Sequence, residues 1–395
     1  MRPSTTRAVH AGRDDLAVLG VHAPPVDLST TYPLPDLGDG VASVDALAAG
    51  AACAASPVYG RVHNPTVYRV ERALAELDGT EEAVCFASGM AALTATLLAT
   101  CAAKRHVVAL RPLYGGSDNL LASGLLGLDV EWAAGIDGVA PAVREDTGLV
   151  VLETPQNPTL GQIDIEAVVV AAGDVPVLVD NTFATPILQQ PSRHGAAYTL
   201  QSATKFLSGH GDVVAGVVSC SAERAAGLRQ VRIATGAILH PLAAYLLHRS
   251  LPTLPFRVRE AQERARVLAA RLQGHPGVTR VHYPVADGRQ LLGPGSVLAF
   301  EAAGGFEAAA AVMASVTLIT PAVSLGCVDT LIEHPAGLTH RVVDEQARAA
   351  SGIGEGAVAP LGRARGRRRP LARPRKRAPR RRQAGCARGV TSAEQ

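Results

Sequence analysis

The segment Ser202-Ala203-Thr204-Lys205 decides the fold of this chain, together with the run Val177-Leu178-Val179-Asp180 upstream of it. Each segment is a short apolar run that finishes in polar side chains. In an α/β protein, buried parallel strands deliver such side chains to the carboxyl edge of the sheet, where ligands bind. The two segments therefore predict an α/β fold with a functional site at that edge.

Lys205 is one of only three lysines in 395 residues, beside Lys104 and Lys376, because arginine takes nearly every other basic position. An amine forms a Schiff base with an aldehyde, and a guanidinium does not. A buried Asp180 carboxylate would keep the ring nitrogen of pyridoxal phosphate protonated, so that the ring accepts electrons. A surface lysine and a helix-capping aspartate remain the alternative from the pattern alone.

The composition is that of a globular protein. Hydrophobic residues make up 47% of the sequence and charged residues 18%, and the length suits one large α/β domain plus a smaller one. Neither a signal peptide nor an apolar run long enough to span a membrane is present, so we expect a cytoplasmic protein with no membrane partner. The six cysteines are scattered without a Cys-x-x-Cys pair, which predicts reduced thiols and no metal site.

Charge and composition divide the chain into four parts. Residues 1–55, rich in Pro, Gly and Ala, predict an extended N-terminal arm that lies on another surface, such as a second subunit. A large domain over residues 56–250 and a small domain over residues 251–358 follow. Residues 357–392 hold thirteen basic and no acidic side chains, which leaves residues 1–356 with 25 basic and 34 acidic ones, a net charge of −9.

Several loops of the large domain carry candidate ligand-binding groups. Tyr59 and Arg61 stand two residues apart and project from the same side of an extended chain, which suits phosphate, although a solvated arginine beside a packing tyrosine fits equally well. Ser88-Gly89 links a predicted strand to an apolar helix, so backbone N–H groups there would form an anion site. Tyr114 and Asn157 lie in turns that follow further strands.

The small domain contains two histidines, His334 and His340, whose spacing is not that of a metal motif. We therefore predict a structural role for both.

The motifs form one ordered set along the chain: Tyr59-Gly60-Arg61, Asn64-Pro65-Thr66, Ser88-Gly89-Met90, Tyr114-Gly115-Gly116, Val179-Asp180-Asn181-Thr182, Ser202-Ala203-Thr204-Lys205, Ser324-Leu325-Gly326 and His334-Pro335. This set resembles the trans-sulfuration family of pyridoxal-phosphate (PLP) enzymes of Cys and Met metabolism, over roughly residues 5–356. The resemblance implies the α/β PLP fold type I, which is aspartate-aminotransferase-like, with a mainly parallel sheet in the large domain and a smaller α/β C-terminal domain. It also implies a homotetramer built as a dimer of dimers.

The resemblance implies three catalytic residues. Lys205 would hold pyridoxal 5'-phosphate as a Schiff base, and Asp180 would pair with the ring nitrogen. Tyr114 would stack on the ring and act as an acid or base toward the leaving thiol. The substrate would be a sulfur amino acid, and the products a thiol, a 2-oxo acid and ammonia.

The resemblance also implies a cofactor site shared between two subunits. Tyr59 and Arg61 would reach the phosphate in the neighbouring subunit's site. Asn157 and Ser324 would place the cofactor oxygen and the substrate. The remaining implied phosphate ligands are Ser88, Gly89, Met90, Ser202 and Thr204.

Four positions bear on which family member the chain is most similar to. Gly116 stands where methionine γ-lyases usually carry Cys, which favours the cystathionine enzymes. Val58, Asn119 and Val323 stand where cystathionine γ-lyases tend to place charged residues, which favours methionine or homocysteine as substrate. We expect cystathionine γ-lyase, which converts L-cystathionine to cysteine, 2-oxobutanoate and ammonia, and keep methionine or homocysteine γ-lyase and cystathionine γ-synthase as alternatives.

The end of the chain departs from the family, which closes its small domain with an Arg-Leu-Ser-Val-Gly-like strand whose Arg binds the substrate carboxylate. Ala359 occupies the Arg position. A GC-rich choice of codons for Ala359–Pro370 spells that strand when read one base later, so we interpret residues 359–395 as a basic, disordered frameshift product. The rival interpretation is an impaired enzyme whose polybasic tail binds nucleic acid without sequence preference. A cofactor-free scaffold is a third alternative, and the retained Lys205 and Asp180 argue against it.

Overall fold

Two central strands, β2 (His106–Leu110) and β4 (Thr147–Glu153), are buried along their whole length in the computed structural model, which describes residues 4–362. Successive side chains of a strand point to opposite faces of the sheet. Val107 and Ala109 accordingly pack into one hydrophobic cluster, and Val108 packs into another. A continuous apolar run thus becomes a strand covered by helices on both faces, as the sequence predicts for a parallel sheet.

The large sheet has seven strands in the order β1-β7-β6-β5-β4-β2-β3. All neighbouring pairs from β6 to β3 are parallel, and β7 alone runs antiparallel to both of its neighbours. The predicted α/β fold with a mainly parallel sheet is confirmed. The remaining strands are β1 (Glu82–Phe86), β3 (Asp129–Ala133), β5 (Val177–Asp180), β6 (Tyr198–Ser202) and β7 (Gly216–Cys220).

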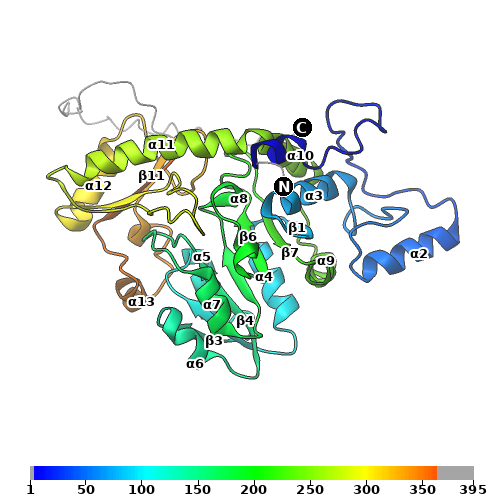
Figure 1. Ribbon diagram of the computed structural model, residues 1–395, viewed down its shortest axis with the longest axis horizontal. Coiled ribbons are helices and arrows are strands. Elements are labelled where there is room, and N and C mark those ends of the chain that lie inside the picture. Colours follow the sequence, from blue (N-terminus) through cyan, green and yellow to red (C-terminus); the bar gives the residue numbers. More distant parts are fainter. Residues whose placement is uncertain (1–3, 363–395) are drawn as a thin grey trace, which may run out of the picture. The chain divides into compact units, whose positions relative to one another are not determined.

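Helices cover both faces of this sheet (Figure 1). One face packs against α4 (Gly89–Thr100) and α9 (Ala222–Thr235). The helices that complete the large sheet's layers are α3 (Pro65–Asp78), α5 (Gly115–Ala122), α6 (Val139–Ala142), α7 (Ile165–Ala172), α8 (Thr185–Leu188), α10 (Pro241–Ser250) and α11 (Leu254–Gln273), with the short 3-10 helices Ile136–Gly138, Pro191–His194 and Leu251–Thr253.

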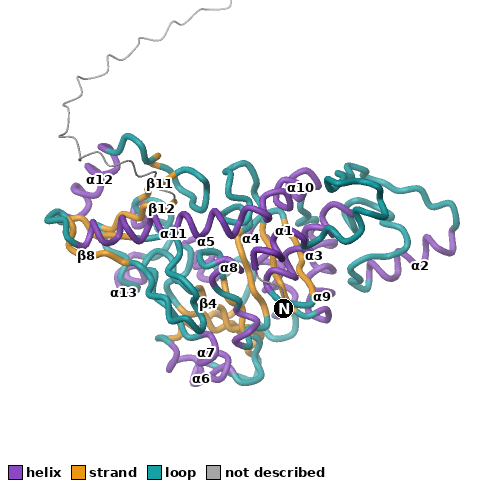
Figure 2. The backbone as a smooth tube through the Cα atoms, turned by 45° about the horizontal axis from the view of Figure 1, so that its top comes forward, coloured by secondary structure: helices purple, strands orange, loops and turns teal. Residues whose placement is uncertain are grey.

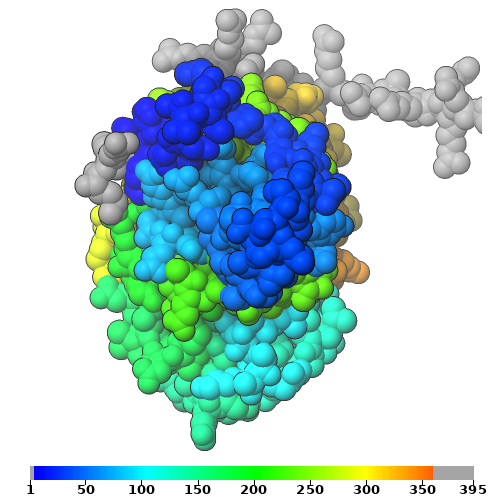
Figure 3. Space-filling model, turned by 90° about the vertical axis from the view of Figure 1, so that its right-hand side faces the viewer, coloured from blue at the N-terminus to red at the C-terminus, as the bar shows by residue number. Residues whose placement is uncertain are grey.

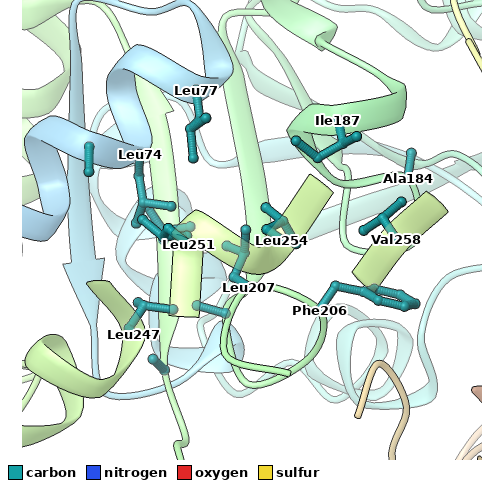
Figure 4. Close-up of a cluster of buried hydrophobic side chains, with 14 of the residues drawn as sticks. Leu74, Leu77, Ala184, Ile187, Phe206, Leu207, Leu247, Leu251, Leu254 and Val258 are labelled. Carbon is teal, nitrogen blue, oxygen red and sulfur yellow. The ribbon is translucent and has the colours of Figure 1, made fainter. Parts of the chain in front are cut away.

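A leucine-rich cluster joins α3, α10 and α11 on the other face (Figure 4). Leu74 of α3 and Leu247 of α10 are fully buried, as are Leu251 in the 3-10 helix before α11 and Leu254, the first residue of α11. Burying each such side chain stabilises the fold by about 1.5–3 kcal/mol. The predicted domain junction near Leu251 therefore lies inside this core and not in a loose linker.

The long helix α11 runs from α8, at the large sheet, to the strand β8 (Val278–His282) of a second sheet (Figure 2). That sheet has five strands in the order β10-β11-β12-β9-β8, and only its β10–β11 pair is parallel. Its other elements are β9 (Ala299–Ala302), α12 (Gly305–Ser315), β10 (Thr320–Pro321), β11 (Thr330–Glu333), the 3-10 helix Pro335–Gly337, α13 (Glu345–Ala350) and β12 (Ala357–Gly362).

The strand β12 runs past residue 359, where the tail is predicted to start. The strand β12 continues to Gly362 and pairs with β11 on one side and β9 on the other. Pro360 lies within it, opposite Ile332. Because proline has no N–H to donate, a strand is expected to end at such a residue. In this protein the strand pairing continues past Pro360. The predictions for residues 363–395, both disorder and nucleic-acid binding, lie outside the described residues.

The N-terminal arm is less extended than predicted for residues 1–55. It contains α1 (Ser4–His10) and α2 (Leu37–Ala48), and the intervening chain forms one isolated bridge between Thr31 and Tyr59. Asp36 caps α2, since its side chain accepts a hydrogen bond from the Asp39 N–H at 2.9 Å. Figure 3 shows the N-terminal residues gathered on one face of the molecule. The Pro- and Gly-rich composition concealed a capped helix.

No helix among residues 4–362 is long and apolar enough to cross a membrane, and no three His, Cys, Asp or Glu side chains within that range are grouped to hold a metal ion. The boundary between the large and small domains at residue 250 stays a prediction.

A buried acid ties the end of α3 to the large sheet. The carboxylate of Asp78 accepts hydrogen bonds from Gln201 Nε2 at 3.0 Å and from Ser219 Oγ at 2.6 Å. Burial raises the pKa of Asp78 to about 7, although the bonds from Ser219 and Gln201 and the charge of Arg7 oppose that shift. The folded state therefore holds a proton that the unfolded state releases near pH 4, and stability falls as the pH rises from about 4 to 7.

We predict that Asp78→Asn flattens this pH dependence. The amide carries no titrating proton, and its N–H₂ group has an acceptor in Gln201 Oε1, which is buried without a partner. The free energy of unfolding, measured by denaturant titration at pH 5 and pH 8, should fall with pH on the order of 2 kcal/mol more in the wild type than in the variant. Asp174→Asn, at an exposed position, is the control. Identical pH slopes for wild type and Asp78→Asn would contradict the assignment.

Candidate active site

A cavity of about 530 Å³ lies where the carboxyl ends of the central strands meet the small domain. The strands β4, β5 and β6 contribute Glu153, Asp180 and Ser202 to its wall, and the small domain contributes Glu333. The structure brings together ten of the predicted site residues in this wall: Ser88, Gly89, Met90, Tyr114, Asn157, Asp180, Ser202, Thr204, Lys205 and Ser324.

Lys205 follows β6 and reaches across the cavity to the small domain. Its Nζ donates a hydrogen bond to Ser324 Oγ at 2.9 Å. Ser324 has a left-handed backbone with φ of 127°, which is rare for a residue with a side chain and marks a conformation held by its surroundings. Burial lowers the pKa of Lys205, although the nearby Cys327 and Glu333 oppose the shift. The ammonium form is therefore disfavoured, and the neutral amine is a nucleophile and a base.

Asp180 and Glu153 stand side by side at the strand ends, in register across β5 and β4. Burial raises the pKa of Asp180 to about 6, and two hydrogen bonds from Thr182 to Oδ1, from N–H at 2.9 Å and from Oγ1 at 2.5 Å, counter it. Burial and then the charge of Asp180 raise the pKa of Glu153 well above its usual range. Asp180 is thus the more acidic carboxyl of this pair, and Glu153 releases its proton at higher pH.

The opposite end of the cavity is built for an anion. Ser88 caps α4, and its Oγ accepts a hydrogen bond from the Ala91 N–H at 3.0 Å. The N–H groups of Gly89 and Met90 belong to the first helical turn, which has no intrahelical acceptors, and the helix dipole adds positive potential. A Cβ at Gly216 would come within 2.2 Å of the Ser88 carbonyl oxygen, so only glycine lets the antiparallel β7 pass this close.

Tyr114 precedes α5 and lines the cavity with its side chain 40% exposed. Its backbone N–H donates to Glu153 Oε2 at 2.7 Å. Burial, followed by the charges of Glu333 and Glu153, raises the pKa of the phenol. The phenol is therefore protonated at neutral pH and available as a proton donor.

Tyr59 and Arg61 do not line this cavity. The Tyr59 side chain is 45% exposed, and the Arg61 guanidinium lies 5.7 Å from its ring centroid. Arg61 Nη1 donates to the carbonyl of Ile233 at 2.7 Å. Both side chains thus lie on the surface of the chain that carries them, outside its own cavity.

The sequence analysis missed several wall residues. Glu153 ends an apolar strand as Asp180 does, and that shared pattern was the available signal. Thr182 supplies both hydrogen bonds that hold Asp180 and stands only two residues after it. Glu333 ends a strand of the small domain, and nothing local in the sequence indicates that it faces Lys205 and Tyr114.

Comparison with known proteins explains this set of groups. Residues 5–359 match the family described as Cys/Met metabolism PLP-dependent enzyme. The chain belongs to this family. The enzyme is a PLP-dependent carbon–sulfur lyase, as the resemblance implied, and its cofactor is pyridoxal 5'-phosphate.

Two curated relatives and one solved structure illustrate the similarity. L-methionine gamma-lyase of Streptomyces avermitilis is 57% identical over 357 residues, which cover 90% of the enzyme and 84% of that relative. L-methionine gamma-lyase of Brevibacterium sandarakinum is 53% identical over 364 residues, with coverages of 89% and 92%. The crystal structure of cystathionine gamma-lyase (CalE6) from Micromonospora echinospora superposes with a TM-score of 0.81 at 36% identity, covering 92% of the enzyme and 95% of that chain. The predicted family and fold type are confirmed.

The cavity fits the cofactor by charge and by distribution of groups. Its anion-binding end suits a phosphate. A carboxylate that ionises more readily than its neighbour suits a protonated ring nitrogen, and a desolvated amine suits the aldehyde. These three groups come from Ser88-Gly89, Asp180 and Lys205.

We predict that Lys205→Ala and Lys205→Arg abolish the yellow colour of the purified enzyme, because only the ε-amine forms a Schiff base with the cofactor. Visible absorbance after desalting measures this. Lys104→Ala is the matched control, since Lys104 is exposed and remote from the cavity wall. Retained colour in Lys205→Ala would assign the cofactor to another amine.

Proposed function

We propose that the enzyme is an L-methionine γ-lyase, which cleaves the Cγ–S bond of L-methionine to give methanethiol, 2-oxobutanoate and ammonia. The observation that carries the proposal is the identity of 57% and 53% with two L-methionine gamma-lyases along about nine tenths of the chain. This favours the alternative of the sequence analysis over its first expectation, cystathionine γ-lyase. On this proposal, Gly116 discriminates poorly between members of the family, and the uncharged Val323 discriminates better.

The wall of the cavity supports a substrate with an apolar tail. Val323, Leu338 and Val214 line it, and the Val323 side chain is 54% exposed to the space. Cystathionine carries a second ammonium and a second carboxylate at its far end. These charged groups would lose their water against the apolar side chains and gain no hydrogen-bond partner there. The thioether methyl of methionine gains from the same contacts. The apolar wall therefore favours methionine.

Lys205 is proposed as the base of the reaction. Pyridoxal phosphate, when bound, supplies an electron sink for negative charge at the substrate carbons. Lys205 Nζ takes the proton from the substrate α-carbon, and burial, which lowers the pKa of the amine, favours its neutral, proton-accepting form. Ser324 Oγ, at 2.9 Å, directs the amine and withdraws it from water.

Tyr114 and Asp180 complete the proposed catalytic set. Tyr114 Oη gives a proton to the leaving sulfur, which its raised pKa permits at neutral pH. The Asp180 carboxylate, fixed by Thr182, holds a proton at the ring nitrogen. Asn157 and Ser324 position the cofactor oxygen and the substrate in this scheme.

We further infer a homotetramer in which Tyr59 and Arg61 serve the phosphate of a neighbouring subunit. Their position outside their own cavity supports this inference, as does the absence of any arginine among the described residues that line that cavity. A phosphate dianion gains most from charge-assisted bonds of an arginine. The remaining phosphate ligands are proposed to be Ser88, Gly89, Met90, Ser202 and Thr204.

We predict that the purified enzyme converts L-methionine with a kcat/KM at least about tenfold above that for L-cystathionine, since apolar contacts discriminate by a few kcal/mol at most. The assay offers methionine, homocysteine, cystathionine and an acylated homoserine in parallel and measures thiol, 2-oxo acid and ammonia. A preference for cystathionine would restore the first expectation. Condensation of the acylated homoserine with cysteine would instead identify a synthase.

We predict that Ala359→Arg raises kcat/KM for methionine. Residue 359 pairs in register with Glu333 across β12 and β11, and Glu333 lines the cavity. Hydrogen bonds from a charged donor contribute about 1.5–3 kcal/mol, which corresponds to roughly ten- to a hundredfold in rate. Ala359→Lys is the control, because lysine lacks the two-pronged geometry that matches a carboxylate. Equal activity of Ala359→Arg and the wild type would exclude position 359 from the substrate carboxylate site.

A further inference from the structure

A chain of hydrogen bonds runs from the cavity wall to the loop that carries Tyr114. Glu333 Oε1 lies 2.9 Å from Thr339 Oγ1, which lies 3.1 Å from His340 Nδ1. His340 Nε2 in turn lies 3.2 Å from the carbonyl oxygen of Leu113, the residue before Tyr114. Glu333 is 3% exposed and His340 is fully buried, so water does not complete these contacts.

The number of protons available to these hydrogen-bonding groups favours one arrangement of donors and acceptors. The carbonyl of Leu113 only accepts, so His340 Nε2 must carry a proton. A neutral imidazole then accepts at Nδ1, and the single hydrogen of the Thr339 hydroxyl goes to it. Glu333 Oε1 must in that case donate to Thr339, which only a protonated carboxyl does, whereas Thr339 Oγ1 donates to Oε1 when the carboxyl is ionised. The reverse arrangement, an ionised Glu333, would require a doubly protonated, buried His340.

Burial and the neighbouring charges agree with the neutral arrangement. Burial lowers the pKa of His340, against the bonds to the carbonyls of Leu113 and Asn157 and the charge of Asp118, and Arg348 lowers it further. Burial raises the pKa of Glu333 to about 7, against Thr339 and the charge of Lys205. Glu333 Oε2 is also buried without a hydrogen-bond partner, which costs less for a neutral carboxyl than for an anion.

We propose that Glu333, Thr339 and His340 form a positioning chain that holds the Tyr114 loop, and that the proton on Glu333 switches this chain on. The histidine predicted to be merely structural thereby acquires a role in the reaction. The other predicted structural histidine, His334, caps a turn through the Gly337 N–H at 2.8 Å, contacts the Glu355 carbonyl and packs edge-on against the Phe306 ring.

The loop around Tyr114 is held from two sides. Glu153 accepts from the Tyr114 N–H, and His340 donates to the Leu113 carbonyl. A Cβ at Gly115 would come within 2.0 Å of the Thr339 carbonyl oxygen, so the Tyr114 loop packs directly against Thr339. Loss of the proton from Glu333 reverses the Thr339 hydroxyl, so His340 Nδ1 loses the hydrogen bond that fixes the orientation of the ring. The bond from His340 Nε2 to the Leu113 carbonyl, one of the two anchors of the Tyr114 loop, is then weakened.

The inference rests on the proposed function only through the role of Tyr114. Two measurements distinguish a failure of the positioning chain from a failure of the proposed function. The first is hydrogen exchange of the cofactor-loaded and cofactor-free enzyme, followed by mass spectrometry over the Tyr114 loop. The expected result is that exchange of this segment rises at least about tenfold between pH 6 and pH 9, after correction for the intrinsic rate, because an anchor is weakened. A corrected rate that does not change with pH would overturn the chain whatever the enzyme's substrate.

Variants test each link of the chain. In Glu333→Gln the amide N–H₂ donates to Thr339 at every pH, so the rise in exchange should vanish, whereas Glu333→Ala should show fast exchange at both pH values. Thr339→Val should exchange fast at both pH values, and Thr339→Ser should restore the wild-type pattern. Thr199→Val is the matched control, because its buried hydroxyl has no hydrogen-bond partner. Equal behaviour of Thr339→Val and Thr199→Val would overturn the proposal.

The second measurement is the pH profile of kcat for the enzyme's best substrate. We expect kcat of the wild type to fall by about tenfold or more from pH 6.5 to pH 9, because a displaced catalytic group loses rate steeply. Glu333→Gln should shift or remove this limb. The exchange experiment can give the expected result while the pH profile of Glu333→Gln equals that of the wild type. In that case the positioning chain has a structural role alone, and Tyr114 does not have the proposed catalytic role. Failure of both measurements would remove the positioning chain itself.

Discussion

The register between β4, β5 and β6 is the constraint on which the site depends. Because Glu153 and Asp180 are paired across two parallel strands, their carboxyl groups are forced together at one sheet edge. Lys205 follows directly from the third strand. A slip of one residue in any of these pairs would turn the acid into the apolar layer on the far side of the strand. The fold thus brings charged groups into a place that burial alone would not allow them to occupy.

Desolvation then separates these groups into different protonation states. Asp180 receives two hydrogen bonds from Thr182 and stays the most acidic of the cavity carboxyls. Glu153 and Glu333 have fewer donors and hold their protons to higher pH. The cavity therefore carries much less negative charge than its composition suggests, which is compatible with an anionic cofactor. Burial has the largest effect on the pKa of all three acids, and the hydrogen bonds from Thr182 distinguish Asp180 from the other two.

The sequence predicted those site residues that a local sequence pattern marks. It did not predict the residues whose role depends on contacts between distant segments. Asp180 was predictable because it ends an apolar strand, and Lys205 because it is a rare lysine that stands among small and polar residues just after a strand. Glu153 has the same local pattern, but its effect comes from its register with Asp180, which no linear pattern encodes. The link between His340 and Leu113 joins residues 227 positions apart. The helix α2 was missed because it lies in a stretch rich in Pro, Gly and Ala, and the end of β12 was missed because Ala359 departs from the closing strand of the family.

The place of β12 in the small sheet has a consequence for biosynthesis. This strand comes last among the described elements, yet it lies between β11 and β9 and not at an edge. During translation the two flanking strands leave the ribosome before the segment that joins them, with their facing hydrogen-bonding groups unpaired. The small sheet cannot close until residues 357–362 have been synthesised. The nascent chain therefore passes through a stage in which the large sheet can fold and the small sheet is still incomplete. At that stage the unpaired strands β9 and β11 are a target for chaperones that bind exposed strands.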